Sequence, residues 1–177
     1  AGVLAEAGKD YASLTCLAVC VGPGSFTGIR VALATATGLS VALGMPVTGV
    51  TALQALALQA LPKAGGQPIF SVIDAHRGDV YVQTFSNDAL PADQPRQISI
   101  EAAAEIAAAA DLFACGSGVP LLGGHPPAVT QDALPNVDAV AFAALNPAMT
   151  VSAKPLYLRK PDAKPQESYT LARAMRG

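Results

Sequence analysis

The 177-residue sequence is poor in charge: 14% of its residues are Asp, Glu, Lys or Arg, whereas 51% are apolar. An average soluble domain carries about 25% charged residues, so part of this surface is expected to be covered by something other than water. The eleven Lys and Arg residues are scattered, and the formal net charge is -2. This composition excludes the basic stripe with which proteins bind long nucleic acids directly. We therefore expect a protein partner.

Cysteine and histidine are scarce too, which argues against a metal site or a disulfide. Cys16 and Cys20 fall in one expected strand, about 13 Å apart at ~3.3 Å per residue, which is too far to bridge. Cys115 is distant from both, and the sequence has no C-x-x-C pair. We expect buried, unbridged thiols in a reducing cytosol. His76 and His125 lie far apart on loops, where structural or solvated roles are expected, so neither a metal nor another cofactor is predicted.

A signal peptide and a membrane span are not expected either. The longest apolar helix breaks at residues 44–46, short of the roughly 20 residues that a span needs. We expect a cytoplasmic protein that does not bind a membrane. The first eight residues, AGVLAEAG, are typical of the last turns of a helix closed by Gly8. We therefore also expect that a natural N-terminal segment is missing from this sequence.

The first third of the chain alternates strand and helix patterns. A continuous apolar run at 14–22 predicts a strand covered on both faces. A helix is predicted over 27–43, a strand over 46–50, and a second helix over 52–61 with Thr51 as its N-cap. This order favours a parallel sheet with covering helices.

The pattern changes near residue 65. Runs at 69–75 and 79–86 flank the polar turn His76-Arg77-Gly78 and predict an antiparallel pair, with Asp74, Arg77 and Asp79 as a small polar network in the turn. After a loop at 87–97, the sequence predicts a helix over 100–110 capped by Ser99, a strand over 111–115, a Pro- and Gly-rich connection over 119–136, a helix over 137–146 and an extended segment over 154–164. We place the domain boundary here, with 1–65 as the remainder of an N-terminal lobe and 66–177 as a C-terminal lobe and tail.

A glycine turn joins the first expected strand to the first long helix. Gly22, Gly24 and Gly28 form G-x-G-x-x-x-G, a geometry that can hold an anion or a nucleotide phosphate at a helix N-terminus. The dinucleotide pattern is incomplete, because no acidic residue stands about 20 positions further on. The alternative is structural: the glycines let strand and helix pack closely, and Ser25 or Thr27 caps the helix.

The helix expected over 27–43 carries no charge after its first turn, so it must be covered on both sides. The side toward the sheet is predicted to carry Ala32, Ala36, Leu39 and Leu43. The other side offers small residues that let a second helix approach closely. Three alternatives for what covers this other side stay open: a helix of this chain, a second copy of the chain, or a different protein. The predicted partner interface is Gly28, Val31, Thr35, Gly38 and Ala42.

Four stretches carry a resemblance to a known family: VGPGSFTGIR at 21–30, GMPVTGVTALQALA at 44–57, DAHRGDVYVQ at 74–83 and KPLYLRKPDAK at 154–164. In this order they resemble the bacterial TsaB (YeaZ) family, part of the machinery that makes threonylcarbamoyladenosine (t6A) in tRNA. The resemblance implies an actin-like, sugar-kinase-like α/β fold of two lobes with mixed sheets. It also implies an incomplete first lobe, because the family's N-terminal hairpin and most of its first helix have no counterpart here.

The resemblance further implies a role without catalysis. The family is similar to its own partner TsaD, the carbamoyltransferase, in which H-x-x-x-H after the equivalent strand holds a metal. Ala52 and Leu56 occupy those positions here, and neither side chain can bind a metal. The chain is expected to have no catalytic residue and to stabilise TsaD by binding it.

The wider assembly also follows from the resemblance. The pair is expected to recruit the ATPase TsaE and to modify the adenosine beside the tRNA anticodon with threonylcarbamoyl-adenylate made by TsaC. This chain is expected to contact tRNA only indirectly. Two alternatives remain open. One is an actin-like nucleotide hydrolase or glycoprotease-like enzyme; the other is a homodimer through the same helix face.

Overall fold

The computed structural model describes residues 2–123, 129–130 and 134–159. Its helices are α1 (Gly2–Glu6), α2 (Phe26–Leu43), α3 (Ala52–Ala60), α4 (Ile100–Ala109) and α5 (Val137–Ala144). Its strands are β1 (Leu17–Cys20), β2 (Val47–Val50), β3 (Ile69–His76), β4 (Asp79–Phe85), β5 (Arg96–Ser99), β6 (Phe113–Cys115) and β7 (Val129–Thr130). The helices expected from the sequence are all confirmed, with ends shifted by a few residues. His125 and the end of the 154–164 segment lie outside the described residues.

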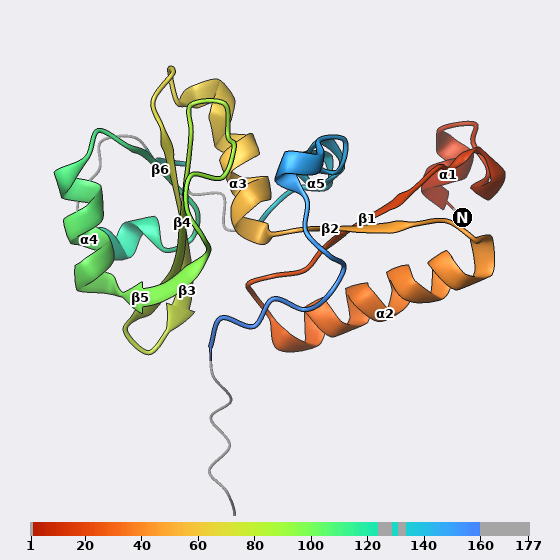
Figure 1. Ribbon diagram of the computed structural model, residues 1–177, viewed down its shortest axis with the longest axis horizontal. Coiled ribbons are helices and arrows are strands. Elements are labelled where there is room, and N and C mark those ends of the chain that lie inside the picture. The colour runs from red at the N-terminus through yellow and green to blue at the C-terminus, as the bar shows by residue number, and fades with distance from the viewer. Residues whose placement is uncertain (1, 124–128, 131–133, 160–177) are drawn as a thin grey trace, which may run out of the picture.

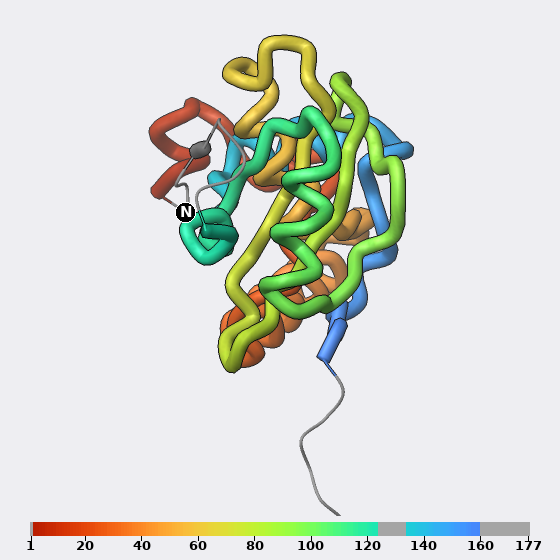
Figure 2. The backbone as a smooth tube through the Cα atoms, turned by 90° about the vertical axis from the view of Figure 1, so that its left-hand side faces the viewer, coloured from red at the N-terminus to blue at the C-terminus, as the bar shows by residue number. Residues whose placement is uncertain are grey.

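The strands form two sheets. β1 and β2 pair in parallel, and a five-stranded sheet has the order β5-β4-β3-β6-β7. In the larger sheet β3 is antiparallel to β4 and parallel to β6, so the sheet is mixed, as expected. Figure 1 shows the larger sheet between α3 and α4, and the two-stranded sheet between α2 and α5. Figure 2 shows α4 lying across one face of the larger sheet.

Each face of the larger sheet has its own apolar core. Leu53 and Leu56 of α3 are buried against Phe85 and Phe113 on one face. On the other face, the core around Ala103 of α4 contains Phe70, Val72, Val80 and Val82. α3 also packs against α5 and links the larger sheet to the smaller one.

α2 stands on the small sheet through Ile29, Leu33 and Ala36, which are buried against Val19 and Val21. These three residues form an i, i+4, i+7 stripe, the spacing of one helix face. The predicted inward face was therefore right for Ala36, and for Ala32, which is half-buried against the same core, whereas Ile29 and Leu33 were not predicted to face the sheet.

Leu43 is the clearest correction to the predicted inward face, because it is 36% exposed. The 18 residues of α2 span about 27 Å at ~1.5 Å per residue. The four residues of β1 span only about 13 Å. The helix therefore extends past the sheet, and its last turn has no strand beneath it. Ala18 of β1 is also exposed, so the first strand is not covered on both faces as expected.

The chain returns to the small sheet after α5. Val151 pairs with Gly49 through two backbone hydrogen bonds of 3.0 and 2.9 Å, and the Leu156 N–H donates to the Val21 carbonyl at 2.9 Å. Figures 1 and 2 show this segment beside the first turn of α2. The lobe boundary near residue 65 stays a prediction.

Two strands lie where loops were expected. β5 begins inside the segment assigned to the 87–97 loop and pairs with β4, with Ile98 opposite Val80. β7 lies in the Pro- and Gly-rich connection and pairs with β6. Both are short edge strands, whose pairing partners are distant in sequence, so local pattern does not indicate them.

The turn between β3 and β4 is polar, and two of the three predicted members, Asp74 and Asp79, have ion-pair partners outside the predicted set. Asp74 lies 3.2 Å from the His76 ring, and Asp79 lies 3.8 Å from the Arg159 guanidinium. Arg159 also donates to the carbonyls of Ala75 and His76 at 2.9 and 3.2 Å. The network therefore joins the turn to the segment that follows α5.

By length and composition alone, α2 is long and apolar enough to cross a membrane, which corrects the expectation that this helix is too short. In this fold one side of α2 lies on β1, and its first turns carry Arg30.

Cys16 is exposed, whereas Cys20 is half-buried and Cys115 is buried. The expectation of three buried thiols is therefore wrong for Cys16, which precedes β1 instead of lying within it. Burial raises the pKa of the Cys20 thiol, opposed in part by a hydrogen bond with the backbone of Gly22.

Because the thiolate is the reactive form, Cys16 is expected to react with DTNB at pH 8 at least about tenfold faster than the other two thiols. Stopped-flow absorbance measures these rates. A Cys16→Ser chain should lose the fast phase, and fast release of more than one equivalent by the parent chain would contradict this assignment.

Candidate functional site

The side of α2 that faces away from β1 is exposed and carries no charge. The five residues predicted as an interface all lie on it at helical spacing, and we call them the outer face: Gly28, Val31, Thr35, Gly38 and Ala42. Val31 is 60% exposed, which is high for a valine in a helix that also packs on a sheet. The structure thus brings these residues together; their role as an interface stays a prediction.

A second exposed stripe adjoins the outer face and was missed in the sequence analysis. We call it the flank: Phe26, Arg30, Ala34, Thr37 and Val41. Phe26 is 54% exposed and Val41 is 81% exposed. Their spacing of four, four, three and four residues is that of one helix face, a signal that was present in the sequence. Outer face and flank together make half of the helix surface, and Arg30 is its single charged residue.

Arg30 lies in a cluster with two aromatic rings at the start of α2. Its guanidinium carbon lies 3.7 Å from the ring centre of Phe26 and 5.9 Å from that of Tyr157. The two rings are 5.5 Å apart and stacked at 30°. Nε of Arg30 donates a hydrogen bond of 2.9 Å to the Tyr157 hydroxyl. The pair connects residues 127 positions apart in sequence.

The glycine turn has a structural role. Gly22 has φ +100° and precedes a cis peptide bond to Pro23. A Cβ at Gly22 would lie 2.7 Å from Cδ1 of Ile29, the far end of a flexible side chain, so the positive φ is the main reason for a glycine at this position. Ser25, and not Thr27, caps α2, with its hydroxyl accepting from the Gly28 N–H at 3.3 Å.

The predicted anion or nucleotide contact of the turn, at Gly22, Gly24, Ser25, Thr27 and Gly28, stays a prediction.

The two positions that the resemblance assigns to metal ligands in TsaD are part of the core. Ala52 and Leu56 are buried, and Leu56 packs against the larger sheet. Among the described residues, no group of three or more His, Cys, Asp or Glu side chains is placed to hold a metal ion. His76 is the exposed last residue of β3, beside Asp74, and does not lie on a loop as expected.

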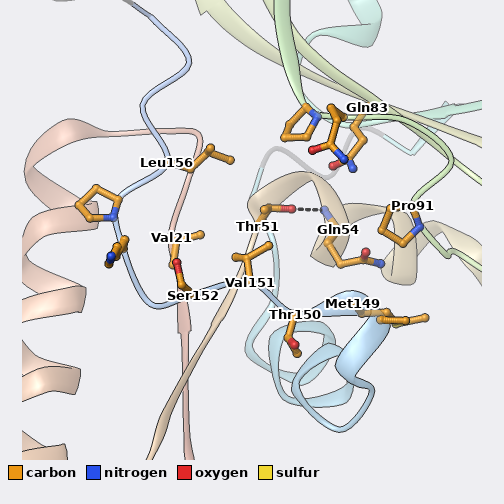
Figure 3. A pocket seen from close by; sticks show the side chains of 15 residues that line it. Val21, Thr51, Gln54, Gln83, Pro91, Met149, Thr150, Val151, Ser152 and Leu156 are labelled. Carbon is orange, nitrogen blue, oxygen red and sulfur yellow. Dashed lines mark hydrogen bonds between the residues drawn. The ribbon is translucent and has the colours of Figure 1, made fainter.

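A cavity of about 440 Å³ lies between the start of α3, the loop after β4 and the segment that follows α5 (Figure 3). Two buried amides contribute to its wall: Gln54 donates to the Ala89 carbonyl at 2.8 Å, and Gln83 donates to the Asp93 carbonyl at 2.9 Å. Its described lining includes Val21 but none of the five glycine-turn residues. The cavity is therefore a separate feature from the turn.

Comparison with known proteins gives a consistent result. The family model of TsaD, tRNA N6-adenosine threonylcarbamoyltransferase, matches residues 1–117. An Escherichia coli protein named tRNA threonylcarbamoyladenosine biosynthesis protein TsaB is 35% identical over 86 residues, which cover 49% of this chain and 37% of that relative. An uncharacterized Mycobacterium tuberculosis protein is 36% identical over 175 residues, covering 92% of this chain and 72% of the relative.

Two solved structures from Pseudomonas aeruginosa have similar folds. One, described as an uncharacterized protein with similarity to peptidase YeaZ, has a TM-score of 0.76 at 31% identity and covers 89% of this chain and 80% of its own. The other, YeaZ, has a TM-score of 0.73 at 30% identity, and the match covers 88% of this chain and 79% of the YeaZ chain.

Proposed function

This chain belongs to the TsaB (YeaZ) family, and we propose that it acts in t6A biosynthesis as the non-catalytic partner of TsaD. Its fold is the actin-like, sugar-kinase-like α/β fold of that family. The name of the E. coli relative supports the pathway, and the exposed half of α2, in which Arg30 is the single charged residue, supports the partnership.

The main observation behind this proposal is that the outer face and the flank of α2 are exposed. Val31 and Val41 stand mostly in water, and covering each would stabilise a complex by about 1 kcal/mol or more. Small residues at Gly38 and Ala42 let the axis of a second helix approach to about 8 Å, the close end of the usual range. Burial of this surface against an apolar helix of a partner is therefore more favourable than its exposure to water.

Ala52 and Leu56 support a role without chemistry, because hydrocarbon side chains in the core cannot hold the metal that TsaD uses. In this proposal the chain stabilises an active arrangement of TsaD in the cytoplasm. The complex recruits a TsaE-like ATPase, and this chain meets tRNA only through TsaD.

Size-exclusion chromatography with light scattering tests the partnership directly. The chain is mixed with purified TsaD, and a complex with the summed mass of the two proteins is expected. Each protein alone is the control, which also reports a homodimer of this chain. If both proteins are folded and elute separately at micromolar concentration, the proposal is wrong.

One observation favours a second candidate, an actin-like nucleotide hydrolase. The cavity beside Thr51 and Gln54 is large enough for a small molecule and has polar groups in its wall. Isothermal titration with ATP and Mg²⁺ separates the two candidates. Saturable binding with ATP turnover by this chain alone would favour the hydrolase, whereas the partner proposal predicts neither.

A further inference from the structure

Arg30 is the single charged residue between Asp10 and Lys63, and it lies on the surface that a partner of α2 would cover. Its guanidinium is already positioned: it stacks on the Phe26 ring, the Tyr157 ring centre lies 5.9 Å away, and Nε donates to the Tyr157 hydroxyl. Within residues 2–123, 129–130 and 134–159, the two terminal nitrogens Nη1 and Nη2 make no hydrogen bond or ion pair. One edge of the guanidinium is therefore held, and its terminal nitrogens have no partner among the residues that the structure describes.

The support for this arrangement comes from the small sheet. Tyr157 follows Leu156, whose N–H donates to the Val21 carbonyl, and Val151 is paired with Gly49. The ring that orients Arg30 is thus anchored to β1 and β2 by backbone hydrogen bonds. A guanidinium held in this way loses little conformational entropy when it binds a ligand.

The surroundings indicate the chemistry of that ligand. The outer face and the rest of the flank are apolar or small, so a partner helix on α2 removes water from around Arg30. A buried guanidinium without a counter-charge is costly, whereas a carboxylate accepts two parallel N–H bonds from it. Nucleic-acid sites use several clustered cations, and α2 has one.

Given the proposed function, on which this inference rests, we propose that Arg30 binds the carboxylate of an Asp or Glu on the TsaD helix that covers α2. Phe26 and Tyr157 are positioning residues for this ion pair. The apolar residues of the outer face supply contact area, and the ion pair fixes the register and orientation of the two helices.

Isothermal titration of TsaD with four chains tests the inference: the parent, Arg30→Met, Arg30→Lys and Tyr157→Phe. Arg30→Met keeps the aliphatic stem but leaves the partner's carboxylate unpaired, and about 30-fold weaker binding or more is expected. Arg30→Lys keeps the charge without the bidentate geometry, so an intermediate loss is expected. Tyr157→Phe should weaken binding less than Arg30→Met does, because stacking remains.

Arg96→Met is the matched control, because Arg96 lies on β5 of the other sheet and pairs with Asp93. It is expected to bind TsaD like the parent chain. In a second arm, Arg30→Glu should lose binding, and a Lys substitution at one TsaD carboxylate should restore it.

The outcomes separate this inference from the function on which it rests. If the parent chain binds TsaD and Arg30→Met binds equally well, the ion pair is wrong and the partnership stands. If the parent chain does not bind TsaD, the proposed function fails and this inference fails with it. If Arg30→Met weakens tRNA binding by the assembled complex while the affinity for TsaD is unchanged, the ligand is a phosphate and the inference is overturned.

Discussion

A Gly38→Arg chain is expected to fold normally and to bind TsaD at least about 1,000-fold more weakly than the parent chain, a loss of about 4 kcal/mol. Gly38 lies in the middle of the outer face, and a Cβ built there meets no atom within 4 Å. The free chain therefore has room for the new side chain. In the complex, the same side chain keeps a partner helix from approaching closely and is buried as a charge without a counter-ion.

Two control variants separate loss of contact from loss of fold. Gly38→Ala adds a methyl group without charge and should raise the free energy of unfolding by about 1 kcal/mol, because glycine is a poor helix former. Ala108→Arg places the same charge on an exposed position of α4. Urea denaturation followed by circular dichroism checks the fold of all three chains. A folded Gly38→Arg chain that binds TsaD like the parent would show that the outer face is not the interface.

Features set by near neighbours in sequence could be predicted well. The predicted helix caps Thr51 and Ser99, and Ser25 of the predicted pair Ser25 or Thr27, each accept a hydrogen bond from the N–H three residues later, at 3.0, 3.2 and 3.3 Å. A cap depends on a hydroxyl and on the backbone beside it, so the sequence contains the whole signal. The β3–β4 pair was predictable for the same reason, because its tight turn lies between two apolar runs.

Features set by distant contacts could not be predicted in this way. Leu43 is exposed because α2 is longer than the strands beneath it, and strand length depends on pairing. The cluster of Arg30 with Tyr157 forms because the segment after α5 returns to the small sheet. No local pattern near residue 30 indicates that return, although the exposed flank itself was readable from its helical spacing.

Gly49→Val is expected to lower the free energy of unfolding by about 3 kcal/mol, at the upper end for overpacked positions. A Cβ at Gly49 would lie 2.7 Å from the Ser152 carbonyl oxygen, 2.9 Å from that of Val151 and 2.8 Å from Cγ1 of Val21. Two of these three atoms belong to the backbone, so a rotamer change cannot relieve the contact. The segment after α5 must move away from β2, which breaks both hydrogen bonds between Gly49 and Val151.

This displacement links stability to the site, because the same segment carries Tyr157 to Arg30. Hydrogen exchange of the Gly49, Val151 and Leu156 amides should speed up in Gly49→Val, and binding to TsaD should weaken even at temperatures where the chain is folded. The sequence contains no Trp, so circular dichroism is the suitable probe of unfolding. Gly24→Ala is the matched control, since its Cβ meets no atom within 4 Å and little change is expected. Equal stability of the Gly49→Val and parent chains would mean that the segment after α5 does not depend on its pairing with β2.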